Sequence, residues 1–174
     1  AVAAADRVVF PGQGAIRDCM GELQARGLVE PVRAAMAGRP FLGICMGLQG
    51  LMEHSEENPD TPGLGVLRGG VHRLPERDPD TGERLKIPHM GWNRVDQRGA
   101  HPLWRGIPDG DRFYFVHSYY VDPADAGLVA GTCRYGRDFV CAVARDNLFA
   151  VQFHPEKSQR AGLQLLENFV RWQP

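Results

Sequence analysis

The sequence predicts a single α/β domain in which helices flank an open, mixed β-sheet. Strand and helix patterns alternate over residues 7–52, as they do in a parallel sheet. The second half instead holds short apolar runs separated by polar turns, which is typical of antiparallel or mixed strands. The chain then ends in an amphipathic helix. Its 174 residues contain no internal repeat and no interdomain linker, so we expect one domain over residues 1–174.

The first half predicts two buried strands and the helices that follow them. An apolar run at 7–10 ends at Pro11-Gly12 and indicates a strand and a turn. Apolar residues then recur at helical spacing over 16–36, with a break at Gly27. A second apolar run at 41–44 leads into a helix that we expect to extend through Leu51 and Met52.

The second half predicts a hairpin tip, four strands and the last helix. Polar residues at 73–84 enclose a turn signal at 78–82. The expected strands are 112–117, 128–135, 139–144 and 148–153. On the last helix, 160–172, we expect Leu163, Leu166 and Val170 to share the apolar face, with Phe169 next to it.

Composition excludes several classes of protein. Twenty Lys and Arg balance 21 Asp and Glu, so no basic excess favours nucleic acid. No apolar run is long enough to span a bilayer, and no signal peptide is visible. The four cysteines form no C-x-x-C pair, and nothing indicates a metal or a cofactor. We therefore expect a cytoplasmic protein with free thiols.

Residues 43–47 read Gly-Ile-Cys-Met-Gly, the cysteine form of a nucleophile elbow. Its glycines leave room for a sharp strand-to-helix turn. That turn would place the Cys45 sulfur at a helix N-terminus, where the helix dipole favours the thiolate. The backbone amide of Met46 would then face the reacting carbonyl. The alternative interpretation is a buried structural cysteine between two packing glycines.

Residues 153–156 read Phe-His-Pro-Glu and follow a predicted strand. A cysteine nucleophile needs a base, and His154 has a suitable pKa. The base needs a group that orients it, and Glu156 is available. Because side chains two apart in extended chain point the same way, both can face one pocket. The alternative is a surface His and Glu in a proline turn.

Together these motifs resemble the class I (triad) glutamine amidotransferases. Residues 11–14, Pro-Gly-Gln-Gly, are similar to the oxyanion strand of that family. The resemblance implies a flavodoxin-like open mixed sheet flanked by helices. It also implies that the backbone amides of Gln13 and Met46 stabilise the oxyanion. The family usually begins with a further strand and helix, so we expect the sheet to lack one or two N-terminal strands.

Three segments narrow the resemblance to the branch that serves imidazole glycerol phosphate synthesis. They are the loop 86–93, whose last six residues read Pro-His-Met-Gly-Trp-Asn, the strand 113–119 and the segment 154–158. The resemblance implies that Cys45 forms a glutamyl thioester from L-glutamine. The ammonia would pass to a (β/α)8-barrel cyclase subunit that makes imidazole glycerol phosphate and AICAR in histidine biosynthesis, in a heterodimer.

The same resemblance assigns the remaining site residues. The α-amino and α-carboxylate groups of glutamine would be held by Gly14, Gln49, Glu57, Ser118 and Tyr119. The partner would be met by Trp92, Asn93 and Tyr114. The alternatives are a core aromatic for Trp92 and exposed polar residues for Gln49 and Glu57.

Other functions remain open at this point. Another triad amidotransferase would serve GMP, anthranilate or aminodeoxychorismate synthesis. A binding subunit would lack catalysis, although the complete set Cys45, His154 and Glu156 speaks against it. A cysteine hydrolase would act on another substrate, such as a γ-glutamyl peptide.

Overall fold

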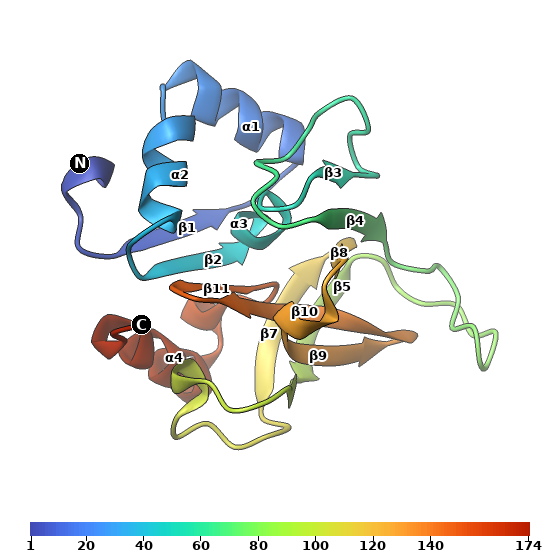
Figure 1. The fold of residues 1–174 in the computed structure, drawn as a ribbon. Coiled ribbons are helices and arrows are strands. Elements are labelled where there is room, and N and C mark those ends of the chain that lie inside the picture. Colours follow the sequence, from blue (N-terminus) through green and yellow to red (C-terminus); the bar gives the residue numbers. More distant parts are fainter.

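The computed structural model describes residues 1–174 and contains a nine-stranded mixed sheet, a two-stranded ribbon and four α-helices (Figure 1). The strands are β1 Val8–Gly12, β2 Phe41–Cys45, β3 His54–Ser55, β4 Gly69–Arg73, β5 His89–Arg94, β6 Asp96–Gln97, β7 Arg112–His117, β8 Tyr119–Pro123, β9 Val129–Tyr135, β10 Arg137–Arg145 and β11 Leu148–Val151. The helices are α1 Ile16–Ala25, α2 Val29–Met36, α3 Met46–Gln49 and α4 Gln159–Arg171. Four short 3-10 helices lie at Val2–Ala4, Pro102–Trp104, Ala126–Leu128 and Pro155–Lys157.

The sheet has a parallel part and an antiparallel part. Its central path runs β1-β2-β11-β10-β8-β4-β3, and β9 and β6 extend from β10. Strands β1, β2 and β11 are mutually parallel, whereas β10 is antiparallel to β11, β8 and β9. The expected α/β architecture with a mixed sheet is therefore confirmed.

Both faces of the parallel strands are covered. Successive side chains of a strand point to opposite faces, and in β2 Phe41 joins one core and Leu42 the other. The first core lies against α1 and α2 and contains Met20 and Val32. The second core is completed by α4, on the other side of the sheet (Figure 1), through Leu165 and other residues. This is why all five residues of β2 are buried.

Three details differ from the expectation. The helix after Cys45 ends at Gln49, and Leu51 and Met52 are buried in the turns that follow. Residues 86–93 are not only a loop, because 89–94 form β5 against β7. On α4, Leu163 and Val170 are 65% and 63% exposed. The buried face of that helix instead holds Ala161, Gly162, Leu165 and Phe169.

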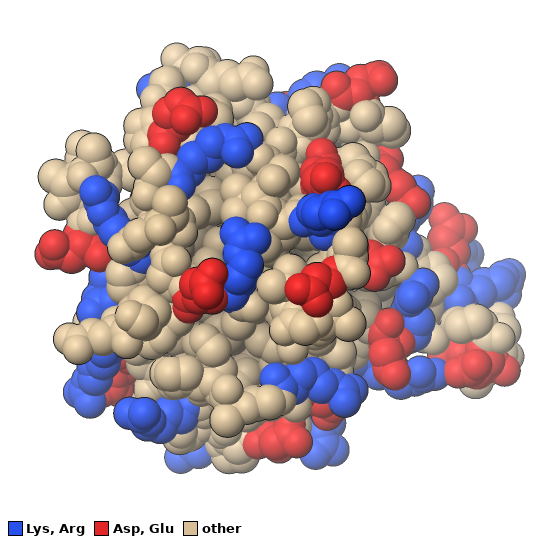
Figure 2. Space-filling view, in the orientation of Figure 1, with Lys and Arg blue, Asp and Glu red and all other residues tan.

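Charged side chains of both signs are mixed on one face of the molecule. Figure 2 shows Lys and Arg interspersed with Asp and Glu on one face, without a patch of a single sign. No helix is both long and apolar enough to cross a bilayer.

Candidate active site

Strand register brings three predicted segments to one edge of the sheet. Gly12 of β1 pairs with Cys45 of β2, and Val151 of β11 pairs with Ile44. Because parallel strands end at the same edge, the residues after Gly12, the cysteine and the residues after Val151 lie together. The edge therefore carries the predicted oxyanion segment, nucleophile and base.

The backbone at Cys45 adopts φ 55° and ψ −105°, a conformation that non-glycine residues rarely accept. Two glycines make this turn possible. A Cβ on Gly47 would collide with the carbonyl oxygen of Phe10 in β1, and a Cβ on Gly43 would lie 2.6 Å from the carbonyl oxygen of Gly47. The glycines of the motif thus allow the turn to pack directly against β1.

The Cys45 thiol is protonated at neutral pH. Burial raises its pKa to about 11, and the negative charge of Glu156 also raises it. Hydrogen bonds donated to the sulfur by the Met46 amide and by Gln152 lower the pKa by less. The expected stabilisation of a thiolate by a helix dipole is therefore wrong for the free protein. The helix has only four residues, and burial outweighs it.

His154 and Glu156 form the predicted pair. The distance between His154 Nδ1 and Glu156 Oε1 is 2.7 Å, so Nδ1 donates to the carboxylate and leaves Nε2 free to accept a proton. Nε2 is buried and has no hydrogen-bond partner. We expected the two side chains to meet because they are two residues apart in extended chain, and this expectation is wrong. Strand β11 ends at Val151, and residues Pro155–Lys157 form a 3-10 turn that brings Glu156 back to the imidazole.

Ser158 fixes the loop that carries the base. Its hydroxyl donates to the His154 carbonyl oxygen at 2.6 Å and accepts from the Tyr114 amide at 2.9 Å. The His154 amide in turn donates to the Tyr114 carbonyl oxygen. The base is thus tied to strand β7 at both backbone groups. No motif indicated this role, because Ser158 acts through a strand that lies 44 residues away in sequence.

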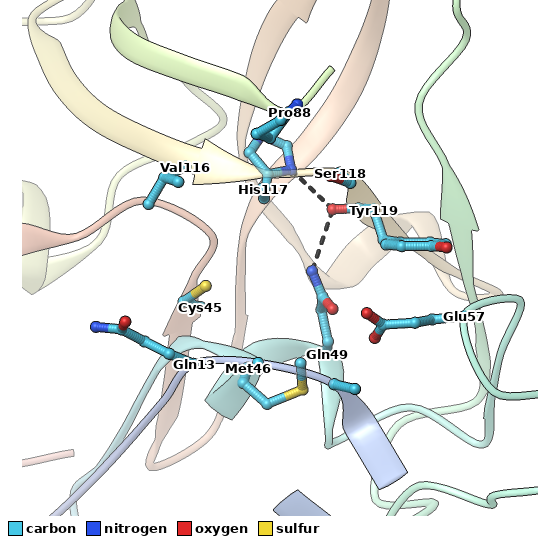
Figure 3. Close-up of a pocket in the computed structure, with 12 residues that line it drawn as sticks. Gln13, Cys45, Met46, Gln49, Glu57, Pro88, Val116, His117, Ser118 and Tyr119 are labelled. Carbon is cyan, nitrogen blue, oxygen red and sulfur yellow. Dashed lines mark hydrogen bonds between the residues drawn. The ribbon is translucent and has the colours of Figure 1, made fainter. Parts of the chain in front are cut away.

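A cavity of about 390 Å³ opens beside Cys45 (Figure 3). It is lined by eight of the predicted residues, namely Gln13, Gly14, Cys45, Met46, Gln49, Glu57, Ser118 and Tyr119. His117, Val116, Pro88 and Ala15 complete the lining. The structure thus brings the predicted oxyanion and substrate-binding residues together, while His154 is buried and is not among the residues that line the cavity.

Polar groups at one end of the cavity suit an ammonium ion. Gln49 Nε2 donates to the Tyr119 carbonyl oxygen at 3.1 Å and to Gln152 Oε1 at 3.0 Å. Its Oε1 therefore points toward Glu57 (Figure 3). One carboxylate oxygen of Glu57 accepts from the Ile16 amide at the start of α1. Two acceptors, one of them charged, thus face this end of the cavity.

Two of the predicted partner residues, Trp92 and Asn93, lie on opposite faces of β5, and the third, Tyr114, lies in β7. Trp92 is 44% exposed and contacts Tyr114 edge-on, so it is not a core aromatic. Trp92 also borders a second cavity of about 430 Å³, shared with Ser158 and Arg160. Asn93 lies on the opposite face, where its side chain bonds within the chain. A partner contact of Asn93 stays a prediction.

The structure holds no group of three or more His, Cys, Asp or Glu side chains placed to bind a metal ion.

The structure also reveals contributors to the site that sequence reasoning missed. Gln152 contacts the Cys45 sulfur, and His89 and His117 form a buried pair. These residues carry no spacing signal, because each acts through a neighbour on another strand.

Comparisons with family models, relatives and solved structures all point to one protein family. The family model described as "Glutamine amidotransferase class-I" matches residues 2–172. Imidazole glycerol phosphate synthase subunit HisH of Dechloromonas aromatica is 65% identical, with 99% of this chain and 80% of the relative covered. The protein of that name from Aromatoleum aromaticum is 63% identical, with 99% and 82% covered. A crystal structure of a glutamine amidotransferase shares the fold, with a TM-score of 0.66, 19% identity, and 95% of this chain and 79% of that chain covered.

Proposed function

The chain belongs to the class-I glutamine amidotransferase family, and we propose that it hydrolyses L-glutamine at Cys45 and passes the ammonia to a cyclase subunit. One observation carries the proposal. A strained cysteine and a His–Glu pair with a free imidazole nitrogen meet at the edge of the sheet, beside a cavity with acceptors for an amino acid.

The proposed reaction begins with proton transfer from the Cys45 thiol to His154 Nε2. The sulfur then attacks the side-chain amide carbon of glutamine, and the amides of Gln13 and Met46 stabilise the oxyanion. His154 returns the proton to the leaving nitrogen, so ammonia departs and a γ-glutamyl thioester remains. Water, deprotonated by His154, attacks the thioester and releases glutamate and the thiol. Glu156 orients the imidazole throughout.

The cavity positions glutamine by its α-substituents in this proposal. Glu57 and Gln49 Oε1 accept hydrogen bonds from the α-ammonium group, since both acceptors face that end of the cavity. The α-carboxylate lies near Gly14, Ser118 and Tyr119, which also line the cavity. The side-chain amide then extends toward the cysteine.

The relatives favour one partner. Proteins 65% and 63% identical are subunits of imidazole glycerol phosphate synthase, which favours histidine biosynthesis over GMP, anthranilate or aminodeoxychorismate synthesis. We propose a heterodimer with a (β/α)8-barrel cyclase that makes imidazole glycerol phosphate and AICAR. The exposed Trp92 and the neighbouring Tyr114 supply the contact surface. The four free cysteines suit the reducing cytoplasm, where we expect the reaction to occur.

Glutamate release from glutamine tests the proposal. We expect low activity for the chain alone and strong stimulation by the cyclase subunit with its nucleotide substrate. Cys45→Ala should reduce the stimulated rate to background, because no thioester can form. Equal rates with and without the cyclase would contradict the coupling, and full activity of Cys45→Ala would contradict the mechanism.

A further inference from the structure

A partly buried chain of hydrogen bonds begins at Asn93, on the inner face of β5. The amide orientation of this residue is fixed, because Oδ1 accepts from the Arg94 amide and Nδ2 donates to the Arg134 carbonyl oxygen at 2.9 Å. Nδ2 has a second hydrogen to donate, and the Nδ2 nitrogen lies 3.2 Å from His89 Nε2. His89 Nε2 is therefore an acceptor.

The acceptor role of His89 determines the tautomers of two histidines. Its Nδ1 carries the proton and donates to His117 Nε2 at 2.9 Å. His117 Nδ1 must then carry the second proton, which it donates to the Tyr119 carbonyl oxygen at 2.7 Å. A proton added to either Nε2 would face another N–H. Both imidazoles are thus held neutral, in one tautomer and one direction.

The surroundings favour the same state. The His89 ring stacks on Tyr135 with ring centroids 4.1 Å apart, and Phe139 packs against both imidazoles. Burial lowers the pKa of His89 to about 4 and that of His117 to about 3.

The chain continues to the nucleophile. The carbonyl oxygen of Tyr119 accepts from both His117 and Gln49 (Figure 3). Gln49 Nε2 also donates to Gln152 Oε1. This fixes the Gln152 amide so that its Nε2 donates to the Cys45 sulfur at 3.7 Å. Each imidazole and amide along this chain of hydrogen bonds has one orientation that satisfies its neighbours on both sides.

We propose that His89 and His117 are positioning residues, because the hydrogen-bond chain that they form fixes the amide proton that Gln152 holds against the nucleophile. This inference rests on the proposed glutaminase function. A correctly oriented amide stabilises negative charge on sulfur as the thiol loses its proton, so the chain supports formation and departure of the thiolate. Neither histidine needs to contact the reacting atoms.

The test measures glutaminase kinetics of variants in the complex with the cyclase. We expect His117→Leu to lower kcat about tenfold while the KM for glutamine changes by less than about threefold. His117→Asn places an N–H where Nδ1 was and should recover most of kcat. His117→Leu combined with Gln152→Leu should be no slower than the slower single variant, because both changes interrupt one chain.

Phe139→Leu is the matched control for damaged packing. Phe139 contacts both imidazole rings but makes no hydrogen bond through its side chain. This variant should unfold at a lower temperature and yet keep kcat within about twofold of the native value, when assayed well below its unfolding temperature.

Three results would overturn the inference while leaving the proposed function intact. They are an unchanged kcat for His117→Leu, additive losses in the double variant, and a loss for Phe139→Leu that equals that for His117→Leu. A native complex that releases no glutamate would overturn the proposed function itself, and this inference with it.

Discussion

At the scale of single residues, Cys45 combines a strained backbone with a protonated thiol. The positive φ exposes the sulfur to the cavity, while burial raises the thiol pKa to about 11. Activation must therefore come from His154, whose Nε2 is unpartnered, rather than from a resting thiolate.

The raised pKa predicts how Cys45 reacts with iodoacetamide. Only the thiolate reacts, so the rate should rise about tenfold per pH unit from pH 7 to pH 10. Mass spectrometry of the peptide that contains Cys45 separates this reaction from that of the half-buried Cys19. In urea-unfolded protein, where the thiol has an ordinary pKa, the rate should level off above about pH 9. A plateau below pH 8 in the folded protein would show a preformed thiolate.

Glu57 tests the assignment of the substrate ammonium. Glu57→Gln keeps an acceptor for the Ile16 amide but removes the charge. A charge-assisted hydrogen bond contributes about 1.5–3 kcal/mol, so kcat/KM for glutamine should fall roughly 10- to 100-fold. The control is Asp60→Asn, an exposed carboxylate in the same loop, which should stay within about twofold. An unchanged kcat/KM for Glu57→Gln would place the ammonium elsewhere.

The positions of the candidate site residues were predicted better than the ionisation state of the thiol. Local patterns located Cys45, His154 and Glu156, and the structure brings them to one edge. The ionisation of the thiol could not be predicted, because it depends on burial by the folded chain. Gln152 was missed for a related reason, since only strand pairing places it beside the sulfur.

At the scale of elements, the site depends on how closely β1 approaches the turn after β2. Gly47 sits directly beneath the Phe10 carbonyl oxygen, and this contact sets the position of the segment that begins at Gln13. The four residues of α3 are too few to stabilise the turn by themselves. Packing between strand and turn therefore holds the nucleophile in place.

Two glycine-to-alanine variants test this contact. Gly47→Ala should lower the free energy of unfolding by more than about 2 kcal/mol, since the methyl group must displace β1. Gly21→Ala should raise it by about 0.5–1 kcal/mol, because Gly21 lies inside α1 and a Cβ there would meet only open space. Urea unfolding gives both values. A tolerated alanine at Gly47 would show that close approach is not required.

The bounds of some elements were predicted better than the faces that they bury. The strand expected at 112–117 has those bounds. On α4 the predicted apolar face was correct for Leu166, which packs against the core, and wrong for Leu163 and Val170, which are exposed. On that helix several apolar residues compete for the core, and the sheet surface selects Leu165 and Phe169 over Leu163 and Val170. The turn that pairs His154 with Glu156 was also beyond prediction, because it follows from contacts of Ser158 with β7.

At the scale of the whole molecule, the catalytic edge and the surface around Trp92 share strands β5 and β7. Strand β7 carries Tyr114 toward Trp92 and binds the loop of His154 through Ser158. The same strand ends at His117, which lines the cavity beside Cys45. A partner that contacts Trp92 therefore meets strands that also position the active site.

Trp92→Ala tests whether this surface binds the cyclase. Buried aromatic side chains dominate many interfaces, so the variant should weaken binding by about 2 kcal/mol or more, roughly 30-fold in Kd. Val170→Ala removes another exposed apolar side chain, near the C-terminal end of α4, and should leave Kd within about twofold. Isothermal titration calorimetry with the cyclase subunit gives both constants. Equal affinity of Trp92→Ala and the native chain would move the interface elsewhere.

Covalent labelling by a diazoketone analogue of glutamine tests the central claim most directly. The analogue should bind where glutamine binds and alkylate the nucleophile, so tandem mass spectrometry of the complex with the cyclase should find one label, on Cys45. Excess glutamine should slow the labelling, and Cys45→Ala should abolish it. Labelling at Cys19, or no labelling of an intact complex, would contradict a glutaminase site built on Cys45, His154 and Glu156.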